Sequence, residues 1–184
     1  MIRKHDPAAH SIFEILLYQG LWAIIYHRIA HWLHKRKLFF PARLVSQFSR
    51  FITGIEIHPG AKIGRGVFID HGAGVVLGET CEVGDNTIIF HGVTLGGTGK
   101  EKGKRHPTVE RNCLIGAGAS ILGPILIGEG AKIGAGALVI KDVPSGHTIV
   151  SEPGRDTAVE QGLRREIAEL SARIEALERM VISE

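Results

Sequence analysis

An aliphatic residue recurs at every sixth position between Val109 and Val143. The leading positions of these hexapeptides are Val109, Ile115, Ile121, Ile127, Ile133 and Val139. Four residues after each stands a second, mostly small side chain: Cys113, Ala119, Ile125, Ala131, Ala137 and Val143. Helices and exposed strands have shorter periods, so a period of six indicates neither. It is typical of a parallel β-helix, in which three hexapeptides make one triangular coil and stacked coils supply the core.

The repeat divides the chain into three regions. We expect residues 1–54 to be helical, because Asp6 and Pro7 suit the start of a helix and Gly54 suits an end. Residues 55–154 are expected to form the β-helix, and residues 155–184 a separate helix. The first part of the β-helix has leading aliphatic residues at Ile57, Ile63, Ile69 and Val75 and, after a slip of two positions near Cys81, at Val83, Ile89 and Leu95.

Two segments depart from the hexapeptide pattern. The segment 96–108, GGTGKEKGKRHPT, must leave the prism as a loop, and loops on rigid scaffolds often carry function. In the last region a heptad seam is formed by Leu163, Ile167, Leu170, Ile174, Leu177 and Val181. Such a seam favours a two-stranded coiled coil, whereas hexapeptide prisms usually assemble as trimers. A seam this short could also fold back on its own subunit, so these alternatives stay open.

Composition narrows the class of protein. The 184 residues carry a formal net charge of +3 and a pI near 9.0, a basicity too mild to indicate nucleic-acid binding. Cys81 and Cys113 form no C-x-x-C pair and suggest no disulfide framework, which fits a reducing compartment. The longest charge-free apolar run near the start, 15–26, is too short to cross a bilayer. We therefore expect a cytoplasmic protein that binds neither nucleic acid nor membrane.

Polar residues that interrupt the repeat are the candidates for a site, because a β-helix by itself is only a scaffold. Asp70 and His71 follow an inward aliphatic residue, and Arg105–His106 lies in the loop. Glu56 and His58 flank the first repeat. A histidine beside a carboxylate can act as a general base near neutral pH. Any one of these histidines taken alone is more simply a solvated surface or corner residue.

Three further patterns carry less weight. GGTGK (96–100) is similar to a phosphate-binding loop, but its first glycine is misplaced and Glu101 stands where the motif requires Ser or Thr. His71, His91 and His106 could be cast as zinc ligands, yet the chain lacks a compact His-x4-His pair, and we expect no metal. The cationic run in the loop is most simply a solvated face.

Four longer strings carry a resemblance to a known family. They are DHGAGVVLGET (70–80), HGVTLGGTG (91–99), RHPT (105–108) and IGAGASILG (115–123). Together with EIHPGAKIGRG (56–66) and shorter matches in the helical region, they resemble serine O-acetyltransferases over nearly all of residues 6–154. The resemblance implies a left-handed parallel β-helix with an N-terminal α-helical region, beside the C-terminal heptad-patterned helix. It also implies acetyl transfer from acetyl-CoA to the hydroxyl of L-serine, giving O-acetylserine for cysteine biosynthesis.

The functional positions of this family map onto residues of the chain. By resemblance, His71 is the general base, and Glu56 is the carboxylate that orients it, at a position where better-known members carry Asp. The substrate-binding positions of the family map to Asp6, Asp70, Arg105 and His106. The acetyl-CoA-binding positions map to Gly97, Thr98, Ala117 and Ala135. The implied mechanism is direct transfer in a ternary complex without a metal.

The resemblance also bears on partners. The short region before Asp6 predicts a trimer, with a hexamer as the alternative, and site residues from two subunits are expected. L-cysteine is the expected feedback inhibitor at the serine site. The chain ends in Val181–Glu184 rather than in the isoleucine that long members insert into cysteine synthase, which makes a complex with cysteine synthase doubtful. A sugar acetyltransferase, a zinc lyase of the carbonic anhydrase type and a non-catalytic trimeric scaffold stand as alternatives.

Overall fold

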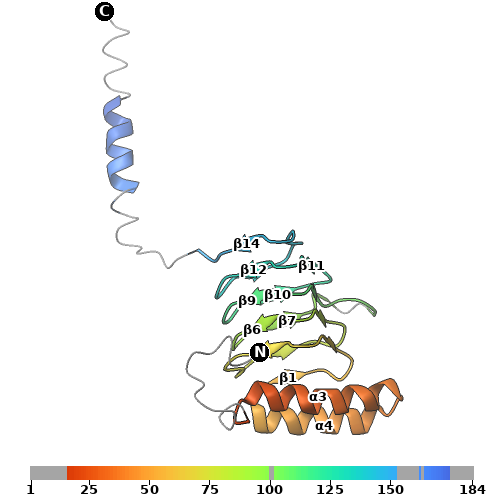
Figure 1. Cartoon of the computed structure of the whole chain (residues 1–184). Coiled ribbons are helices and arrows are strands. Elements are labelled where there is room, and N and C mark those ends of the chain that lie inside the picture. The colour runs from red at the N-terminus through yellow and green to blue at the C-terminus, as the bar shows by residue number, and fades with distance from the viewer. Residues whose placement is uncertain (1–15, 100–101, 153–161, 163, 175–184) are drawn as a thin grey trace, which may run out of the picture. The chain divides into compact units, whose positions relative to one another are not determined.

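The computed structural model describes residues 16–99, 102–152, 162 and 164–174. The chain forms two compact units, Met1–Ser151 and Glu152–Glu184. Within the first unit, fourteen short strands among the described residues form three parallel sheets, which make the faces of a triangular prism (Figure 1). The prediction of a left-handed parallel β-helix preceded by a helical region is confirmed.

The strands are two or three residues long and are separated by turns. Sheet A contains β1 (Glu56–Ile57), β4 (Val76–Leu77), β7 (Thr94–Gly96), β10 (Ser120–Leu122) and β13 (Leu138–Val139). Sheet B contains β2 (Lys62–Ile63), β5 (Glu82–Val83), β8 (Thr108–Val109) and β11 (Leu126–Ile127). Sheet C contains β3 (Phe68–Ile69), β6 (Ile88–Ile89), β9 (Leu114–Ile115), β12 (Lys132–Ile133) and β14 (Thr148–Ile149). From the pair β1–β4 to the pair β10–β13, each strand pairs with the third strand after it in the chain. One coil therefore contributes one strand to each face.

The hexapeptide pattern explains the core of the prism. The leading side chains Ile115, Ile121 and Ile127 point inward and are fully buried, as are the small corner residues Ala119 and Ala131. Burial of one such aliphatic side chain is worth roughly 1.5–3 kcal/mol. A single coil offers few of these contacts, so the stack as a whole holds the fold together.

The first half of the repeat contains an insertion of two residues, which the spacing alone places near Cys81. The structure places this insertion elsewhere. The inward aliphatic residue after Ile69 is Leu77, because the register of β4 with β1 and β7 places it there. Val75 is also buried, but it fills the corner position two residues earlier. The insertion therefore lies in the turn 70–75 and not near Cys81, which corrects the sequence-based prediction.

Two helices cover the β1 end of the prism (Figure 1). They are α3 (Gln19–Lys35) and α4 (Phe39–Thr53), which pack on each other. Gly20 allows α3 to approach β3, because a Cβ atom there would lie 2.2 Å from the carbonyl oxygen of Ile69. Gly54, with a φ of +69°, ends α4 and turns the chain into β1. The glycine expected to stop the helical region does so.

His27 on α3 gives a prediction for pH-dependent stability. Its side chain is 2% exposed, and burial, with the charges of His31 and Arg28 adding, lowers the pKa of His27 to about 3. Below its ordinary pKa of 6.5 the unfolded chain therefore binds a proton that the folded protein excludes. The free energy of unfolding should fall as the pH drops from 6.5 toward 3, by up to ~1.4 kcal/mol per pH unit from this group. Urea unfolding of wild type and His27→Phe should give a shallower pH slope in the variant; equal slopes would contradict the assignment.

The second unit contains a helical segment at residues 164–174. Three seam residues of the predicted heptad, Ile167, Leu170 and Ile174, are described there and are more than half exposed. Leu163, Leu177 and Val181 lie outside the described residues. Among the helices that the structure describes, none has the length and apolar character needed to cross a membrane.

Candidate active site

Two corners of the prism flank sheet A, and the predicted site residues divide between them. Corner I is the set of turns leading from sheet C to sheet A, at residues 70–75, 90–93, 116–119 and 134–137. Corner II leads from sheet A to sheet B, at residues 58–61, 78–81, 97–99 with 102–107, and 123–125. Corner I carries Asp70, His71, Ala117 and Ala135, whereas corner II carries Gly97, Thr98, Arg105 and His106.

Backbone hydrogen bonds stack the turns of corner I into a column. The carbonyl oxygens of Ala73, His91 and Ala117 each accept a hydrogen bond from a glycine N–H of the next turn, at 2.9, 2.8 and 2.8 Å. Ala135 occupies the same position in the turn above. Apart from His91, the column carries methyl side chains, which leave the backbone of this edge accessible to an extended ligand.

His71 projects from the foot of this column because the two-residue insertion lengthens its turn. His71 and Gly72 have φ values of +57° and +56°, and an L residue other than glycine seldom adopts this conformation. The turn is closed by hydrogen bonds from the Gly72 and Ala73 N–H groups to the carbonyl oxygens of Asp70 and His71, at 2.6 and 2.7 Å. The exposed ring of His71 lies 6.1 Å from that of His91, nearly perpendicular to it. Such unusual backbone conformations concentrate at functional sites.

Asp70 and His71 share a pocket with the first helix of the described chain. The pocket has a volume of about 350 Å³ and is lined by Leu17, Tyr18, Gln19 and Gly20 together with Ile69, Asp70 and His71. A carboxylate and an imidazole thus border a cavity large enough for a small amino acid. The roles of His71 as a general base and of Asp70 as a contact for a substrate ammonium group stay predictions.

At corner II an ion pair holds the guanidinium of Arg105. Its Nη2 atom lies 2.5 Å from Oε2 of Glu79, on the turn that follows β4. The hydrogen bond from Arg105 lowers the pKa of the Glu79 carboxyl, and the nearby His58 adds to this effect. Both side chains are partly exposed, at 30% and 39%, so exposed N–H groups of the guanidinium can meet a ligand.

His106, next to Arg105, is held by the same turn. Its Nδ1 atom lies 2.9 Å from the hydroxyl of Thr80 and 3.2 Å from the Thr80 backbone nitrogen. The ring lies against Gly78, where a Cβ atom would stand 2.0 Å from the Cδ2 atom of His106. Burial lowers the pKa of His106, and the neighbouring cations Arg105 and Lys104 lower it further, against the opposing charge of Glu79. The imidazole is therefore neutral near pH 7.

The two described ends of the loop 96–108 meet at corner II. A Cβ atom on Gly97 would lie 3.1 Å from the carbonyl oxygen of Arg105, so a side chain there would crowd the returning strand of the loop. Thr98 lies over Gly123, whose Cβ position would be 3.3 Å from the Thr98 hydroxyl. The structure therefore places Gly97 beside Arg105 and Thr98 over Gly123, both at corner II, whereas Ala117 and Ala135 lie at corner I.

Glu56 lies on β1 of sheet A, between the two corners. Its carboxylate forms ion pairs with Arg50 at 3.2 Å and Arg43 at 3.7 Å, both from α4. No hydrogen bond or ion pair joins it to His71, although both residues are described. The orienting role of Glu56 stays a prediction, and Asp6 lies outside the described residues.

Sequence reasoning missed the residues that hold Arg105 and His106. Gly78, Glu79 and Thr80 stand about 26 positions earlier in the chain and contact the pair only because of the coil geometry. They form the end of the quoted string DHGAGVVLGET, which is the one signal that could have singled them out. His58 was noted for its position, and its electrostatic interaction with Glu79 places it beside this cluster.

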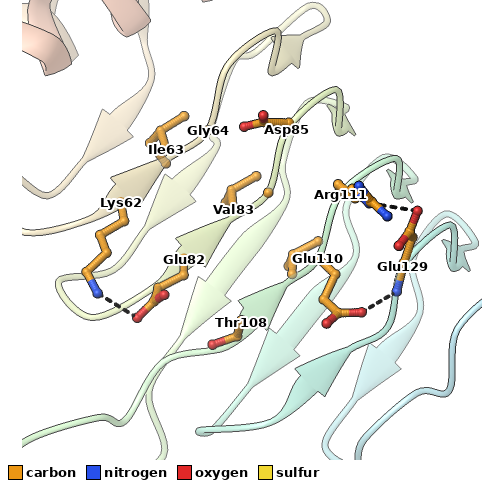
Figure 2. Close-up of a pocket in the computed structure, with 12 residues that line it drawn as sticks. Lys62, Ile63, Gly64, Glu82, Val83, Asp85, Thr108, Glu110, Arg111 and Glu129 are labelled. Atoms are coloured by element: carbon orange, nitrogen blue, oxygen red, sulfur yellow. Dashed lines mark hydrogen bonds and ion pairs between the residues drawn. The ribbon is translucent and has the colours of Figure 1, made fainter.

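A groove of about 640 Å³ on sheet B lies away from these residues (Figure 2). Two ion pairs lie in it, Lys62 with Glu82 at 3.1 Å and Arg111 with Glu129 at 2.8 Å, while the carboxylates of Asp85 and Glu110 accept hydrogen bonds from the backbone N–H groups of Arg65 and Glu129. None of the predicted site residues lines it. The described residues also assemble no group of three or more His, Cys, Asp or Glu side chains that could hold a metal ion.

Comparison with known families agrees with this architecture. Residues 106–141 match the family described as bacterial transferase hexapeptide (six repeats). The stacked coils and the polar insertions at two corners thus define a hexapeptide-repeat transferase.

Proteins of similar sequence identify the family within this class of transferase. The serine acetyltransferase of Bacillus subtilis (strain 168) is 66% identical over 151 residues, covering 82% of this chain and 70% of the relative. The chain belongs to the serine acetyltransferase family.

Solved structures are similar over the same region. Serine acetyltransferase of Neisseria gonorrhoeae in complex with serine gives a TM-score of 0.78 at 44% identity, covering 84% of this chain and 64% of that one. The enzyme of Brucella abortus in complex with coenzyme A gives 0.79 at 46% identity, with 84% and 62% covered. A serine acetyltransferase in complex with cysteine gives 0.80 at 43% identity, with 84% and 60% covered. The chain thus spans slightly less than two thirds of these crystallised proteins.

Proposed function

We propose that this chain transfers the acetyl group of acetyl-CoA to the hydroxyl oxygen of L-serine, with His71 as the general base. The observation that carries the proposal is the insertion at residues 70–75. It projects an imidazole beside a carboxylate, from a corner whose stacked turns carry methyl side chains apart from His91. Family membership and the serine and coenzyme A complexes of similar structures support the choice of substrates.

The reaction needs a base because a serine hydroxyl is a weak nucleophile at neutral pH. His71 takes the hydroxyl proton as the oxygen attacks the thioester carbonyl, a contribution of about 10²–10⁴-fold in rate. The carbon–sulfur bond then breaks, and the proton passes from His71 to the leaving thiolate. The products are O-acetylserine and the free thiol of CoA. One direct transfer in a ternary complex accounts for every atom and requires no covalent enzyme intermediate.

Charged residues at the two corners suit the two ends of an amino acid. Arg105 presents a planar guanidinium to the substrate carboxylate, and neutral His106 adds an N–H donor. Asp70 lines the pocket next to His71 and suits the substrate ammonium group, a role that Asp6 would share. A sugar substrate offers neither charge, and this favours serine over the sugar acetyltransferase alternative.

The column of corner I suits acetyl-CoA. Ala117 and Ala135 leave room for the pantetheine arm along the edge of the prism, above His71. Gly97 and Thr98 at corner II complete the binding groove in this proposal. Acetyl-CoA supplies an activated thioester, and the residues of the chain orient it and hold the proton.

The position of the two corners implies that one site takes residues from two chains. Corners I and II lie on opposite sides of sheet A, and among the described residues no side-chain hydrogen bond or ion pair joins them. Corner I of one prism would face corner II of the next around a three-fold axis, giving a trimer, with a hexamer as the alternative. Phe40 and Phe51 of α4 are 80% and 87% exposed, which fits burial in an assembly.

L-cysteine would occupy the serine site as a feedback inhibitor, since it shares the ammonium and carboxylate groups of serine. The cysteine complex of a similar structure supports this proposal. We place the activity in the cytoplasm, where the free, buried thiols of Cys81 and Cys113 stay reduced.

The activity can be tested by release of the CoA thiol from acetyl-CoA in the presence of a chelator. L-serine should support release, whereas L-alanine, which has the same charged groups and no hydroxyl, should not. Release with a sugar acceptor and not with serine would favour a sugar acetyltransferase. Activity that appears only when zinc is restored would favour a metal-dependent reaction.

A further inference from the structure

We propose that Thr80 is a positioning residue that fixes His106 in the neutral tautomer with its proton on Nε2, so that His106 acts as a hydrogen-bond donor to the substrate and not as a base. The substrate contact rests on the proposed function above. The tautomer rests on the geometry of corner II alone.

Two donors converge on Nδ1 of His106. The backbone N–H of Thr80 lies 3.2 Å away and can only donate, so Nδ1 must offer a lone pair. The Thr80 hydroxyl lies 2.9 Å from the same atom. Its oxygen already accepts hydrogen bonds from the backbone N–H groups of Arg105 at 3.1 Å and of His106 at 3.2 Å. The hydroxyl proton is therefore left to point at Nδ1.

This arrangement leaves one position for the proton of a neutral imidazole. With Nδ1 occupied by two donors, the proton lies on Nε2, which forms no hydrogen bond with the described residues. Burial and the adjacent Arg105 and Lys104 lower the pKa of His106, so the doubly protonated ring is disfavoured at neutral pH. A neutral ring with its proton on Nε2 can donate to a carboxylate and has no free lone pair with which to accept the serine proton.

The two histidines therefore have different roles. His106 is locked as a donor at corner II, whereas His71 at corner I receives no such pair of donors from the residues that the structure describes and keeps a ring nitrogen for proton transfer. Gly78 contributes by leaving space for the ring of His106, whose Nε2 atom would lie 2.1 Å from a Cβ atom there. Thr80 thus acts through His106, without touching the reacting atoms.

Two substitutions distinguish the effect of the Thr80 hydroxyl group from the effect of the rest of that side chain. Thr80→Val keeps the backbone N–H and the branched shape but removes the hydroxyl, leaving two backbone N–H groups without their acceptor. Thr80→Ser restores the hydroxyl and removes only a methyl group. The hydroxyl is the shorter of the two contacts to Nδ1, and its loss leaves only the backbone N–H at 3.2 Å. The pKa of His106 should therefore rise in the valine variant, and the Nδ1–H tautomer should become partly populated.

The test is nitrogen NMR of protein labelled with ¹⁵N-histidine, with the His106 signals assigned by a His106→Gln variant. Wild type and Thr80→Ser should show the Nε2–H tautomer, and Thr80→Val should show exchange with the Nδ1–H form. In kinetics, Thr80→Val should raise the KM for serine by about tenfold with a smaller change in kcat. A wild-type His106 that carries its proton on Nδ1, or a valine variant with an unchanged tautomer and pKa, would overturn the proposal.

The NMR result does not depend on turnover. If the chain failed to acetylate serine while His106 kept the Nε2–H tautomer and lost it in Thr80→Val, the positioning role would stand and the substrate assignment would fall. If the valine variant did not fold, the wild-type spectrum would still decide the tautomer, and the proposal would fall with an Nδ1–H signal.

Discussion

Replacement of His71 by asparagine is expected to lower the kcat of serine acetylation by about 10²–10⁴-fold, because the attacking hydroxyl loses its base. Asparagine is chosen because it tolerates the left-handed conformation of this turn. The chain itself places asparagine in that conformation twice, at Asn86 and Asn112, with φ values of +58° and +59°. The thermal unfolding midpoint should therefore stay close to that of wild type, and steady-state kinetics would measure the loss.

A control variant shows whether the loss of turnover is specific to His71 or follows the removal of any exposed histidine. His147 is exposed and lies on the turn before β14, outside both corners, so His147→Asn should keep wild-type turnover. Unchanged kcat in a well-folded His71→Asn variant would exclude His71 as the base. The search for another base would then turn to His91, whose ring lies 6.1 Å from that of His71.

Replacement of Arg105 by alanine should raise the KM for serine by roughly 10–100-fold, because a charge-assisted contact with the substrate carboxylate is lost. Glu79 would also lose its partner and place a negative charge near that carboxylate. Arg105→Lys should recover only part of the affinity, since an ammonium lacks the planar fork of donors. The KM for acetyl-CoA should change little in either variant.

Arg111 provides the matched control for the loss of an arginine. It forms an ion pair with Glu129 on the sheet B groove, away from both corners (Figure 2). Arg111→Ala should leave both KM values unchanged. An Arg105→Ala variant with wild-type KM for serine would remove Arg105 from the substrate site and weaken the assignment of corner II.

The hexapeptide spacing was sufficient to predict the coils and most inward-facing residues, because a period of six has few structural solutions. It misplaced the insertion for a physical reason. Val75 and Leu77 are both fully buried, so the pattern of apolar residues fits either as the inward position. Only the pairing of β4 with its neighbours in sheet A distinguishes them. The place of the insertion matters because the two extra residues lengthen the turn from which His71 projects.

Contacts at corner II could not be derived from the spacing. The neighbours of Arg105 and His106 depend on how many residues each turn holds and on where the long loop returns, and the period does not encode either. Glu56 shows a related limit. The prediction paired it with His71, but the described chain pairs it with Arg43 and Arg50, since Gly54 turns the chain so that β1 runs beside α4.

Corner I of one chain and corner II of its neighbour should form one active site, and subunit complementation is the experiment that decides this. His71→Asn and Arg105→Ala chains carrying different affinity tags would be co-expressed, and mixed assemblies purified over both tags. With serine kept below the wild-type KM, each variant alone should have at most about a tenth of wild-type activity, the first through its lower kcat and the second through its higher KM for serine. In a cyclic trimer of mixed composition, one of the three sites combines an intact His71 with an intact Arg105, so mixed trimers should have about one third of wild-type activity. Mixed trimers as inactive as the parent variants would show that both residues act within a single chain.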